Sequence, residues 1–329
     1  MDKQKVLVAG AGGFIGGFLT AKLLELGYEV RAVDIKPLSD WYQLHDAAEN
    51  WTMDLKGEVA CRRAVKDCSE VFNLAADMGG MGFIETHKAD CMLSVLINTN
   101  LLRASRHADI ERFFYASSAC VYAADKQIDP DVTALKETDA YPAMPEDGYG
   151  WEKLFSERMC RHFTEDYGLL TRVARFHNVY GPHGTFEGGR EKAPAAICRK
   201  VINATLNDEY GITIWGDGEQ TRSFMYIDDC IEGILRIMYS DCTEPLNLGS
   251  AELVSINDLV TLAESFAGVS LNRDYDLDAP QGVRGRNSDN TLIYEILGWE
   301  PSISLDVGLR KTYDWISDEL VCRKFGGKP

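Results

Sequence analysis

The sequence lacks any long hydrophobic run. No window reaches the length of a membrane-spanning helix, and the N-terminus offers only a strand-length apolar run, Lys5 to Ala9, so we expect neither a membrane span nor a signal peptide. Its nine cysteines include no C-x-x-C pair. Scattered thiols indicate neither a disulfide framework nor a zinc site, so we predict reduced cysteines, no metal and a cytoplasmic location.

Positive charge is also scarce. The 34 lysines and arginines stand against 51 aspartates and glutamates, and the formal net charge is −17. Nucleic acids and anionic membrane surfaces both need a basic face, so we expect neither as a partner. An acidic protein can still bind an anionic small molecule where basic residues converge locally. The length of 329 residues suits two domains or one elaborated domain.

A dinucleotide-binding unit is present at the N-terminus. Val6 to Ala9 reads as a buried strand, and an apolar-periodic helix follows from about Phe14 to Leu26. Between them, Gly10, Gly13 and Gly16 form a G-x-x-G-x-x-G turn. Such glycines permit a tight turn, a close approach to a pyrophosphate and close helix packing, and the helix N-terminus offers N–H groups to phosphate.

Further strands extend this unit. Glu29 to Val33 forms a second strand that ends at Asp34, where a carboxylate bonds a ribose 2′-hydroxyl and repels a 2′-phosphate. This favours NAD over NADP, although the nearby Lys36 weakens the argument. A strand at Ser69 to Leu74 runs into Ala75 to Gly82, whose glycines and methionines indicate either a backbone-lined ligand wall or a merely flexible loop.

A short aromatic run ends in two hydroxyls and a thiol. Phe113 to Ala116 has the bounded apolar character of a buried parallel strand, and Ser117, Ser118 and Cys120 follow it. Ligands of open α/β sheets bind beyond the carboxyl ends of the strands, so we expect these three side chains to face a ligand. A lone cysteine is otherwise more often a small core residue.

Tyr149 and Lys153 stand four residues apart and share one face of the predicted helix that reaches about Tyr167. A Y-x-x-x-K match arises easily by chance. The upstream dinucleotide unit and Ser118 make a catalytic group the better interpretation.

The alternation of strands and helices ends near Asn178, and composition then changes from Gly184 to Lys200. We therefore predict an α/β fold, with a Rossmann-type doubly wound parallel sheet and a smaller, discontinuous α/β domain. The predicted division places residues 1–177 and 221–249 in the first domain and residues 178–220 and 250–329 in the second.

Together these motifs resemble the extended short-chain dehydrogenase/reductases of the NAD-dependent epimerase/dehydratase family, and within them the GDP-mannose 3,5-epimerases. The resemblance covers nearly the whole chain, but residues before Phe72 and those from Tyr122 to Ala140 follow the pattern loosely. The segments that carry it are Phe72 to Phe83, Phe113 to Cys120, Arg175 to Asn178, Gly188 to Pro194 and Val283 to Asn290.

The resemblance implies a role for each matching residue. Tyr149 would be the base of hydride transfer, with Lys153 lowering its pKa and Ser118 holding the same oxygen, while Cys120 and Lys192 would exchange protons. NAD would be bound by Gly10, Gly13, Phe14, Ile15, Gly16, Asp34, Asp54, Leu74, Ala75, Ala76, Tyr149 and Lys153. The nucleotide sugar would be bound by Gly79, Ser118, Ala119, Cys120, Asn178, Glu191, Lys192, Ala193, Lys200, Gln220, Thr221, Arg222 and Arg286.

The resemblance also implies the reaction and the assembly. Oxidation at C4 of GDP-mannose makes the hydrogens on C3 and C5 acidic, proton exchange inverts both carbons, and re-reduction gives GDP-L-galactose, with GDP-L-gulose beside it. The protein would be a homodimer. The substrate carries a pyrophosphate, and the basic residues of the second half that could meet it are Arg190, Lys200, Arg222, Arg284 and Arg286.

Two other functions remain open on the sequence. A C4-epimerase of another nucleotide sugar would need Ser118, Tyr149 and Lys153 but neither Cys120 nor Lys192. A non-enzymatic NAD-sensing module would need none of them. A 4,6-dehydratase would require a carboxyl group after the serines, where this chain has only an alanine and the thiol of Cys120.

Overall fold

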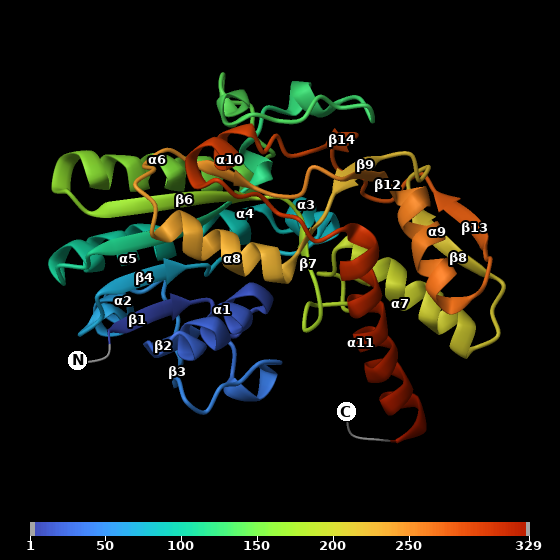
Figure 1. The fold of residues 1–329 in the computed structure, drawn as a ribbon, viewed down its shortest axis with the longest axis horizontal. Coiled ribbons are helices and arrows are strands. Elements are labelled where there is room, and N and C mark those ends of the chain that lie inside the picture. The colour runs from blue at the N-terminus through green and yellow to red at the C-terminus, as the bar shows by residue number, and fades with distance from the viewer. Residues whose placement is uncertain (1–3, 327–329) are drawn as a thin grey trace.

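The computed structural model describes residues 4–326, and its main feature is a seven-stranded parallel sheet in the order β11-β6-β5-β4-β1-β2-β3 (Figure 1). All six neighbouring pairs run parallel. The strands are β1 (Lys5–Ala9), β2 (Glu29–Asp34), β3 (Glu49–Thr52), β4 (Glu70–Asn73), β5 (Arg112–Ser118), β6 (Leu170–Phe176) and β11 (Leu246–Leu248). The strand order reverses direction between β1 and β4, which is where doubly wound sheets bind their ligands. The predicted fold class is confirmed.

Helices cover both faces of this sheet because its central strands are apolar on both sides. Along β1, Val6 and Val8 belong to one hydrophobic core, whereas Leu7 and Ala9 belong to the other. The first face carries α1 (Phe14–Glu25) and α8 (Ile227–Met238), and the second carries α2 (Glu58–Val65), α5 (Val95–His107) and α6 (Tyr149–Tyr167).

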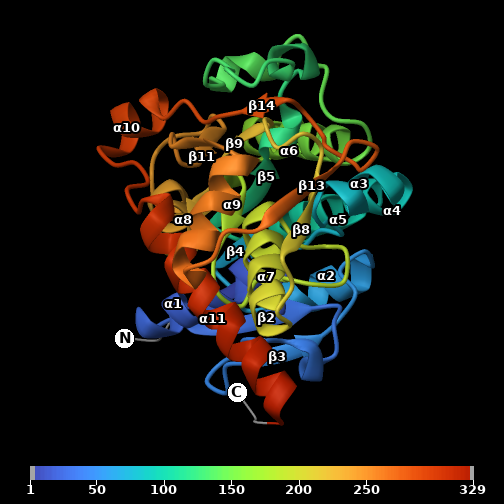
Figure 2. The same cartoon turned by 90° about the vertical axis from the view of Figure 1, so that its right-hand side faces the viewer.

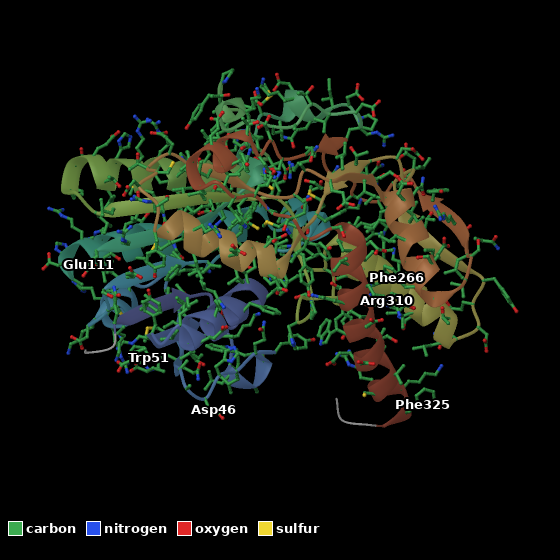
Figure 3. All side chains as sticks on the ribbon, viewed as in Figure 1. Asp46, Trp51, Glu111, Phe266, Arg310 and Phe325 are labelled. Carbon is green, nitrogen blue, oxygen red and sulfur yellow. The ribbon has the colours of Figure 1, made fainter. Side chains whose placement is uncertain are left out.

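A smaller α/β part lies beyond the carboxyl ends of the strands (Figure 2). Its helices pack on one another, and Arg310 of α11 lies over the ring of Phe266 of α9, 5.3 Å from its centroid (Figure 3). Its helices are α7 (Ala193–Leu206), α9 (Ile256–Ala267), α10 (Thr291–Leu297) and α11 (Leu305–Phe325). Its strands are β7 (Val179–Tyr180), β8 (Gly211–Trp215), β9 (Thr221–Ser223), β10 (Met225–Tyr226), β12 (Leu253–Ser255), β13 (Asn272–Asp276) and β14 (Gly285–Arg286).

The chain returns to the large sheet through α8 and β11, whereas β9 pairs with β12 and β14 in the smaller part. The predicted division at residues 177, 220 and 249 remains a prediction. None of the helices within residues 4–326 is long and apolar enough to cross a membrane. All nine cysteines are free.

One predicted helix is divided. The pattern from 88 to 107 predicts a single helix, but the structure has α4 (Lys88–Met92) and then α5, with a break at Ser94. The Ser94 hydroxyl is buried and accepts a hydrogen bond from the backbone N–H of Asp77 at 2.9 Å. The break therefore ties the helices to the loop after β4, which itself contains the short helix α3 (Met81–Thr86).

Candidate active site

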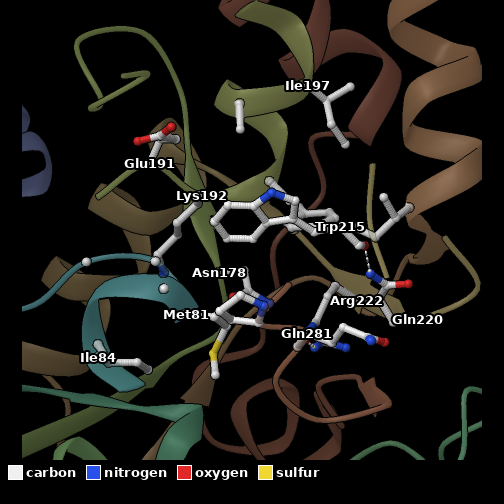
Figure 4. Close-up of a pocket in the computed structure, with 18 of the residues that line it drawn as sticks. Met81, Ile84, Asn178, Glu191, Lys192, Ile197, Trp215, Gln220, Arg222 and Gln281 are labelled. Atoms are coloured by element: carbon white, nitrogen blue, oxygen red, sulfur yellow. Dashed lines mark hydrogen bonds between the residues drawn. The ribbon is translucent and has the colours of Figure 1, made fainter. Parts of the chain in front are cut away.

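One cavity opens between the two parts of the molecule, at the carboxyl ends of β5 and β6 (Figure 4). Its walls come from the loop after β4, the turn after β5, the start of α6, the start of α7, and strands β8 and β9. Most of the predicted substrate residues meet there, as expected from strand ends that share one sheet edge. The predicted residues that line the cavity are Gly79, Ser118, Ala119, Cys120, Tyr149, Asn178, Glu191, Lys192, Ala193, Lys200, Gln220, Arg222 and Arg286.

The end of β5 separates its two serines. Ser118 lines the cavity, and its oxygen accepts a hydrogen bond from the Cys120 backbone N–H at 3.2 Å. Ser117 points the other way and donates to Glu157 at 2.5 Å. Successive side chains of a strand face opposite sides of the sheet, so the expectation that Ser117 also faces the ligand was wrong.

Tyr149 and Lys153 occupy one face of α6, as predicted. Gly148 enters the helix with a φ of 75°, which a glycine adopts readily, and Tyr149 is buried at the cavity wall. The Lys153 ammonium lies 5.5 Å from the centroid of the Tyr149 ring and donates to the Ala116 carbonyl at 3.0 Å. Lys153 itself is not among the residues that line the cavity.

The expected lowering of the Tyr149 pKa is not found. Burial raises this pKa well above its ordinary value, and the negative charges of Cys120 and Glu152 raise it further. A hydrogen bond with Ser118 acts in the opposite direction. Desolvation dominates because a phenolate loses its hydration when the ring is enclosed.

Cys120 and Lys192 come from different segments and line the same cavity. Cys120 sits in the 3-10 turn after β5, and Arg286 donates to its sulfur at 3.6 Å. Burial, followed by the charge of Glu146, raises the pKa of the Cys120 thiol to about 11. Lys192 caps α7 and reaches toward Met81 and Asn178 (Figure 4), and burial lowers its pKa.

The five basic residues predicted to meet the pyrophosphate converge on the cavity only in part. Lys200 donates to the Thr213 carbonyl at 2.6 Å, and the buried Arg222 donates to the Val283 carbonyl at 2.5 Å, so both are held at the cavity wall. Two of the five predicted residues do not line the cavity. Arg190 pairs with Asp77 at 2.8 Å, and Arg284 pairs with Asp217 through two contacts of 2.8 Å.

Alternation along β9 also separates the predicted Gln220, Thr221 and Arg222. Gln220 and Arg222 line the cavity, and the buried Gln220 Oε1 has no hydrogen-bond partner within residues 4–326. Thr221 is not among the lining residues, and its hydroxyl donates to the Pro130 carbonyl at 2.5 Å. Its predicted contact with substrate therefore has no support from its position.

The glycine turn fits a dinucleotide pyrophosphate. Gly10 has a φ of 86°. A Cβ on Gly16 would lie 2.1 Å from the Gly10 carbonyl oxygen, so the turn and the first turn of α1 pack together with no room for a side chain. Gly13 caps α1 without a side-chain hydrogen bond, which leaves N–H groups at the helix N-terminus for a phosphate. Phe14 and Ile15 pack their side chains against the core and can contribute only backbone groups.

The end of β4 borders the same glycine turn. A Cβ on Gly10 would lie 2.9 Å from the backbone of Leu74 and Ala75, so these residues border the turn, with Ala76 next in the chain. Asp34 closes β2 and accepts from the backbone N–H of Lys36 at 3.0 Å. The Lys36 ammonium donates to the Gly12 carbonyl of the glycine turn at 3.2 Å.

Asp54 follows β3, at the same sheet edge as Asp34. Its carboxylate accepts from the backbone N–H of Lys56 at 2.9 Å. A carboxylate held in this way keeps acceptor capacity for a ribose or adenine group.

Several residues of the site were not predicted. Trp215 and Gln281 line the cavity, whereas Met81, which also lines it, lies within the Ala75 to Gly82 stretch considered as a ligand wall. Glu146 lies behind Cys120 and pairs with Arg286. Trp215 directly precedes a glycine turn, which was the one available signal, whereas Glu146 lies in an irregular segment that has no motif.

Three comparisons with known proteins agree with this geometry. A model of the NAD dependent epimerase/dehydratase family matches residues 6–249. GDP-mannose 3,5-epimerase 1 of Oryza sativa subsp. indica is 47% identical over 327 residues, covering 99% of this chain and 85% of the rice protein.

Solved structures show the same architecture. The UDP-glucose 4-epimerase of Thermotoga maritima, solved with UDP-glucose, has a TM-score of 0.86 at 27% identity, covering 96% of this chain and 100% of that one. The UDP-glucuronic acid 4-epimerase of Bacillus cereus, solved with UDP-glucuronic acid and NAD, has a TM-score of 0.81 at 26% identity, with 96% and 100% covered.

The chain therefore belongs to the NAD dependent epimerase/dehydratase family, and NAD is its cofactor. Within that family it is an epimerase, and the rice relative that it matches over nearly its whole length is a GDP-mannose 3,5-epimerase.

Proposed function

We propose that this chain is a GDP-mannose 3,5-epimerase, which inverts C3 and C5 of the mannose ring of GDP-mannose to give GDP-L-galactose. Inversion at C5 alone gives GDP-L-gulose. The observation that carries the proposal is that Cys120 and Lys192 line one cavity together with Tyr149 and Ser118. Chemistry at C4 alone needs Tyr149 and Ser118 but has no use for a second pair of titratable groups.

The hydrogens on C3 and C5 become acidic only when C4 is a ketone. NAD, when bound, supplies the oxidation of C4 and its later reduction. Tyr149, whose phenolate the positive charge of bound NAD would favour, takes the proton of the C4 hydroxyl during oxidation and returns it at the end. Ser118 donates a hydrogen bond to the same oxygen and, with Tyr149, stabilises the negative charge that develops there when a neighbouring proton leaves.

Inversion requires one group to remove a proton from the ring and another to deliver a proton to the opposite face. Cys120 reaches the cavity from the end of β5, and Lys192 reaches it from the start of α7. Burial raises the pKa of the Cys120 thiol and lowers the pKa of the Lys192 amine, so enclosure favours a protonated thiol and a neutral amine. The neutral amine can therefore remove a proton from the ring, while the thiol can deliver its own proton to the opposite face.

The phosphates of the substrate would lie against the basic part of the wall. Lys200, Arg222 and Arg286 line the cavity and supply local positive charge in an otherwise acidic protein. Asn178, with a φ of 34°, and Glu191 line the same wall. Glu191 is fixed by the Gly189 N–H at 2.7 Å and by Arg199 at 3.0 Å, so its carboxylate is oriented before substrate arrives.

Turnover of GDP-mannose in deuterated water tests the proposal. We expect deuterium at C3 and C5 of the product, because each inverted carbon receives a solvent-derived proton. Product without ring deuterium would instead indicate a C4-epimerase, the activity of the Thermotoga maritima neighbour. If no nucleotide sugar reacts although NAD is bound, the chain is a binding module and the proposal is wrong.

We also propose that the protein is a homodimer that works in the cytoplasm. Met92, Leu93 and Leu96, where α4 meets α5, are each more than two-fifths exposed, as are Trp151 and Phe155 on the neighbouring α6. Large apolar side chains grouped on adjacent helices are typical of a protein interface. The free thiols suit a reducing compartment.

A further inference from the structure

Glu146 lies behind the substrate cavity, in contact with the residues that form its reactive wall. Its backbone N–H donates to the Cys120 carbonyl at 3.0 Å, and its carboxylate accepts a charged hydrogen bond from Arg286. Arg286 is held in turn by Gln127 at 2.6 Å and donates to the Cys120 sulfur at 3.6 Å. Glu146, Arg286 and Cys120 thus form one compact cluster, and all three side chains are largely enclosed.

One oxygen of this carboxylate is unused. Glu146 Oε2 is buried and has no hydrogen-bond partner among residues 4–326. A buried acceptor without a donor costs about 1–3 kcal/mol, so such an atom calls for an explanation. Cys120 carries the neighbouring proton, and the negative charge of Glu146 raises the pKa of its thiol.

Glu146 is not among the residues that line the cavity, whereas Cys120 and Arg286 are. It therefore acts through Cys120 rather than on the sugar. We propose that Glu146 is a positioning residue for Cys120. The Glu146 carboxylate accepts a hydrogen bond from the thiol and keeps the sulfur protonated and oriented in the resting enzyme. The catalytic meaning of this arrangement rests on the proposed epimerase function.

The charges around Cys120 explain why the Glu146 carboxylate affects the pKa of the thiol. The charge of Arg286 and a hydrogen bond with Ser118 favour the thiolate, but burial and Glu146 together outweigh them, and the pKa of Cys120 is raised to about 11. Removing the negative charge of Glu146 leaves Arg286 and Ser118 opposed by burial alone, so the thiol becomes more acidic. The titratable, charged and hydrogen-bonding groups that face Cys120 are Glu146, Arg286, Arg222, Lys192, Tyr149 and Ser118.

The test is the pH dependence of Cys120 alkylation by iodoacetamide, followed on its own peptide by mass spectrometry. In Glu146→Gln we expect the midpoint to fall by about one pH unit or more, which raises the rate at neutral pH about tenfold. Glu85→Gln is the matched control, because Glu85 is an exposed carboxylate near Glu146. Its Cys120 midpoint should equal that of the wild type.

This measurement needs no substrate turnover, so it stands or falls independently of the epimerase proposal. An unchanged midpoint in folded Glu146→Gln would overturn the inference. Should Glu146→Gln not fold, Glu146→Asp keeps the charge but withdraws the carboxylate by one methylene, and we expect a smaller shift in the same direction. A purely structural role would lower the folded fraction of either variant without moving the midpoint.

Discussion

At the scale of single residues, burial and nearby charges together set the pKa values of the reactive groups. Burial and the charge of Glu146 raise the pKa of Cys120, the charge of Arg286 lowers it, and burial, the largest effect, keeps the residue a thiol. Lys192 experiences the same enclosure, and for an amine this favours the neutral form. The same physical cause therefore prepares one group to give a proton and the other to take one.

The first prediction concerns Cys120→Ala. This change removes a proton carrier but leaves Tyr149 and Ser118 in place, so we expect incorporation of deuterium at C3 and C5 to fall by about 10²–10⁴-fold. Oxidation at C4 should continue, which is measured by the near-ultraviolet absorbance of reduced nicotinamide. Cys91→Ala is the control, because Cys91 is buried in the same hydrophobic cluster. Normal exchange in Cys120→Ala would show that another residue carries the proton.

The sequence predicted which residue types form the site better than it predicted their directions. The motif around Ser118 was recognisable, but Ser117 faces the opposite side of the sheet and donates to Glu157 of α6. Thr221 is a second such case, between two residues that do reach the cavity. Glu146 could not be predicted, because its importance comes from a contact with Arg286, which is 140 residues distant in the chain.

At the scale of elements, local signals decided how well the boundaries could be predicted. Helix α6 ends at Gly168, whose φ of 74° forms a left-handed cap, and the predicted end near Tyr167 is correct. The break at Ser94 had no such signal. It depends on a hydrogen bond from the loop after β4, and a tertiary contact of this kind leaves no periodic pattern in the sequence.

The second prediction concerns the glycine turn. In Gly16→Ala the new methyl group would lie 2.1 Å from the Gly10 carbonyl oxygen and 2.8 Å from the Ala11 Cα, so β1 and α1 must separate. We expect a loss of about 1–3 kcal/mol in the free energy of unfolding, together with weaker binding of NAD. Urea unfolding and the amount of NAD that copurifies measure the two effects.

Gly57→Ala provides the control for this prediction. Gly57 also precedes a helix, but a Cβ there would meet nothing closer than 3.7 Å, and its φ of −86° suits any residue. Loss of a favourable N-cap residue and reduced freedom of the unfolded chain oppose each other, so the stability of Gly57→Ala should change by only a few tenths of a kcal/mol. Equal behaviour of the two variants would mean that the close approach at Gly16 does not matter.

At the scale of the whole molecule, the third prediction concerns assembly. Trp151 and Phe155 lie one turn apart on α6 and are 45% and 52% exposed. Replacing both by glutamate places charge in the proposed interface, so we expect the dimer to dissociate into folded monomers in sedimentation velocity. Tyr210→Glu is the control, because Tyr210 is 82% exposed on a different part of the surface. A wild-type monomer, or a variant that stays dimeric, would contradict the prediction.

The last prediction concerns acid stability and depends on His177, which follows β6 and contacts the neighbouring strand β11 of the large sheet. This side chain is fully buried after β6, and its Nε2 lies 2.9 Å from Asn247 Oδ1 of β11. Its Nδ1 has no hydrogen-bond partner within residues 4–326. Burial lowers the pKa of His177 from 6.5 to about 3, so the folded protein holds the ring neutral.

The sign of the effect follows from proton uptake. Between pH 6.5 and pH 3 the unfolded chain protonates this histidine and the folded protein does not, so stability is lost as pH falls through that range. The loss is about 1.4 kcal/mol per pH unit for one proton. Between pH 6.5 and 5 it precedes protonation of most carboxylates, so we expect His177→Gln to reduce the slope of unfolding free energy against pH there. A slope for His177→Gln equal to that of the wild type would refute the assignment.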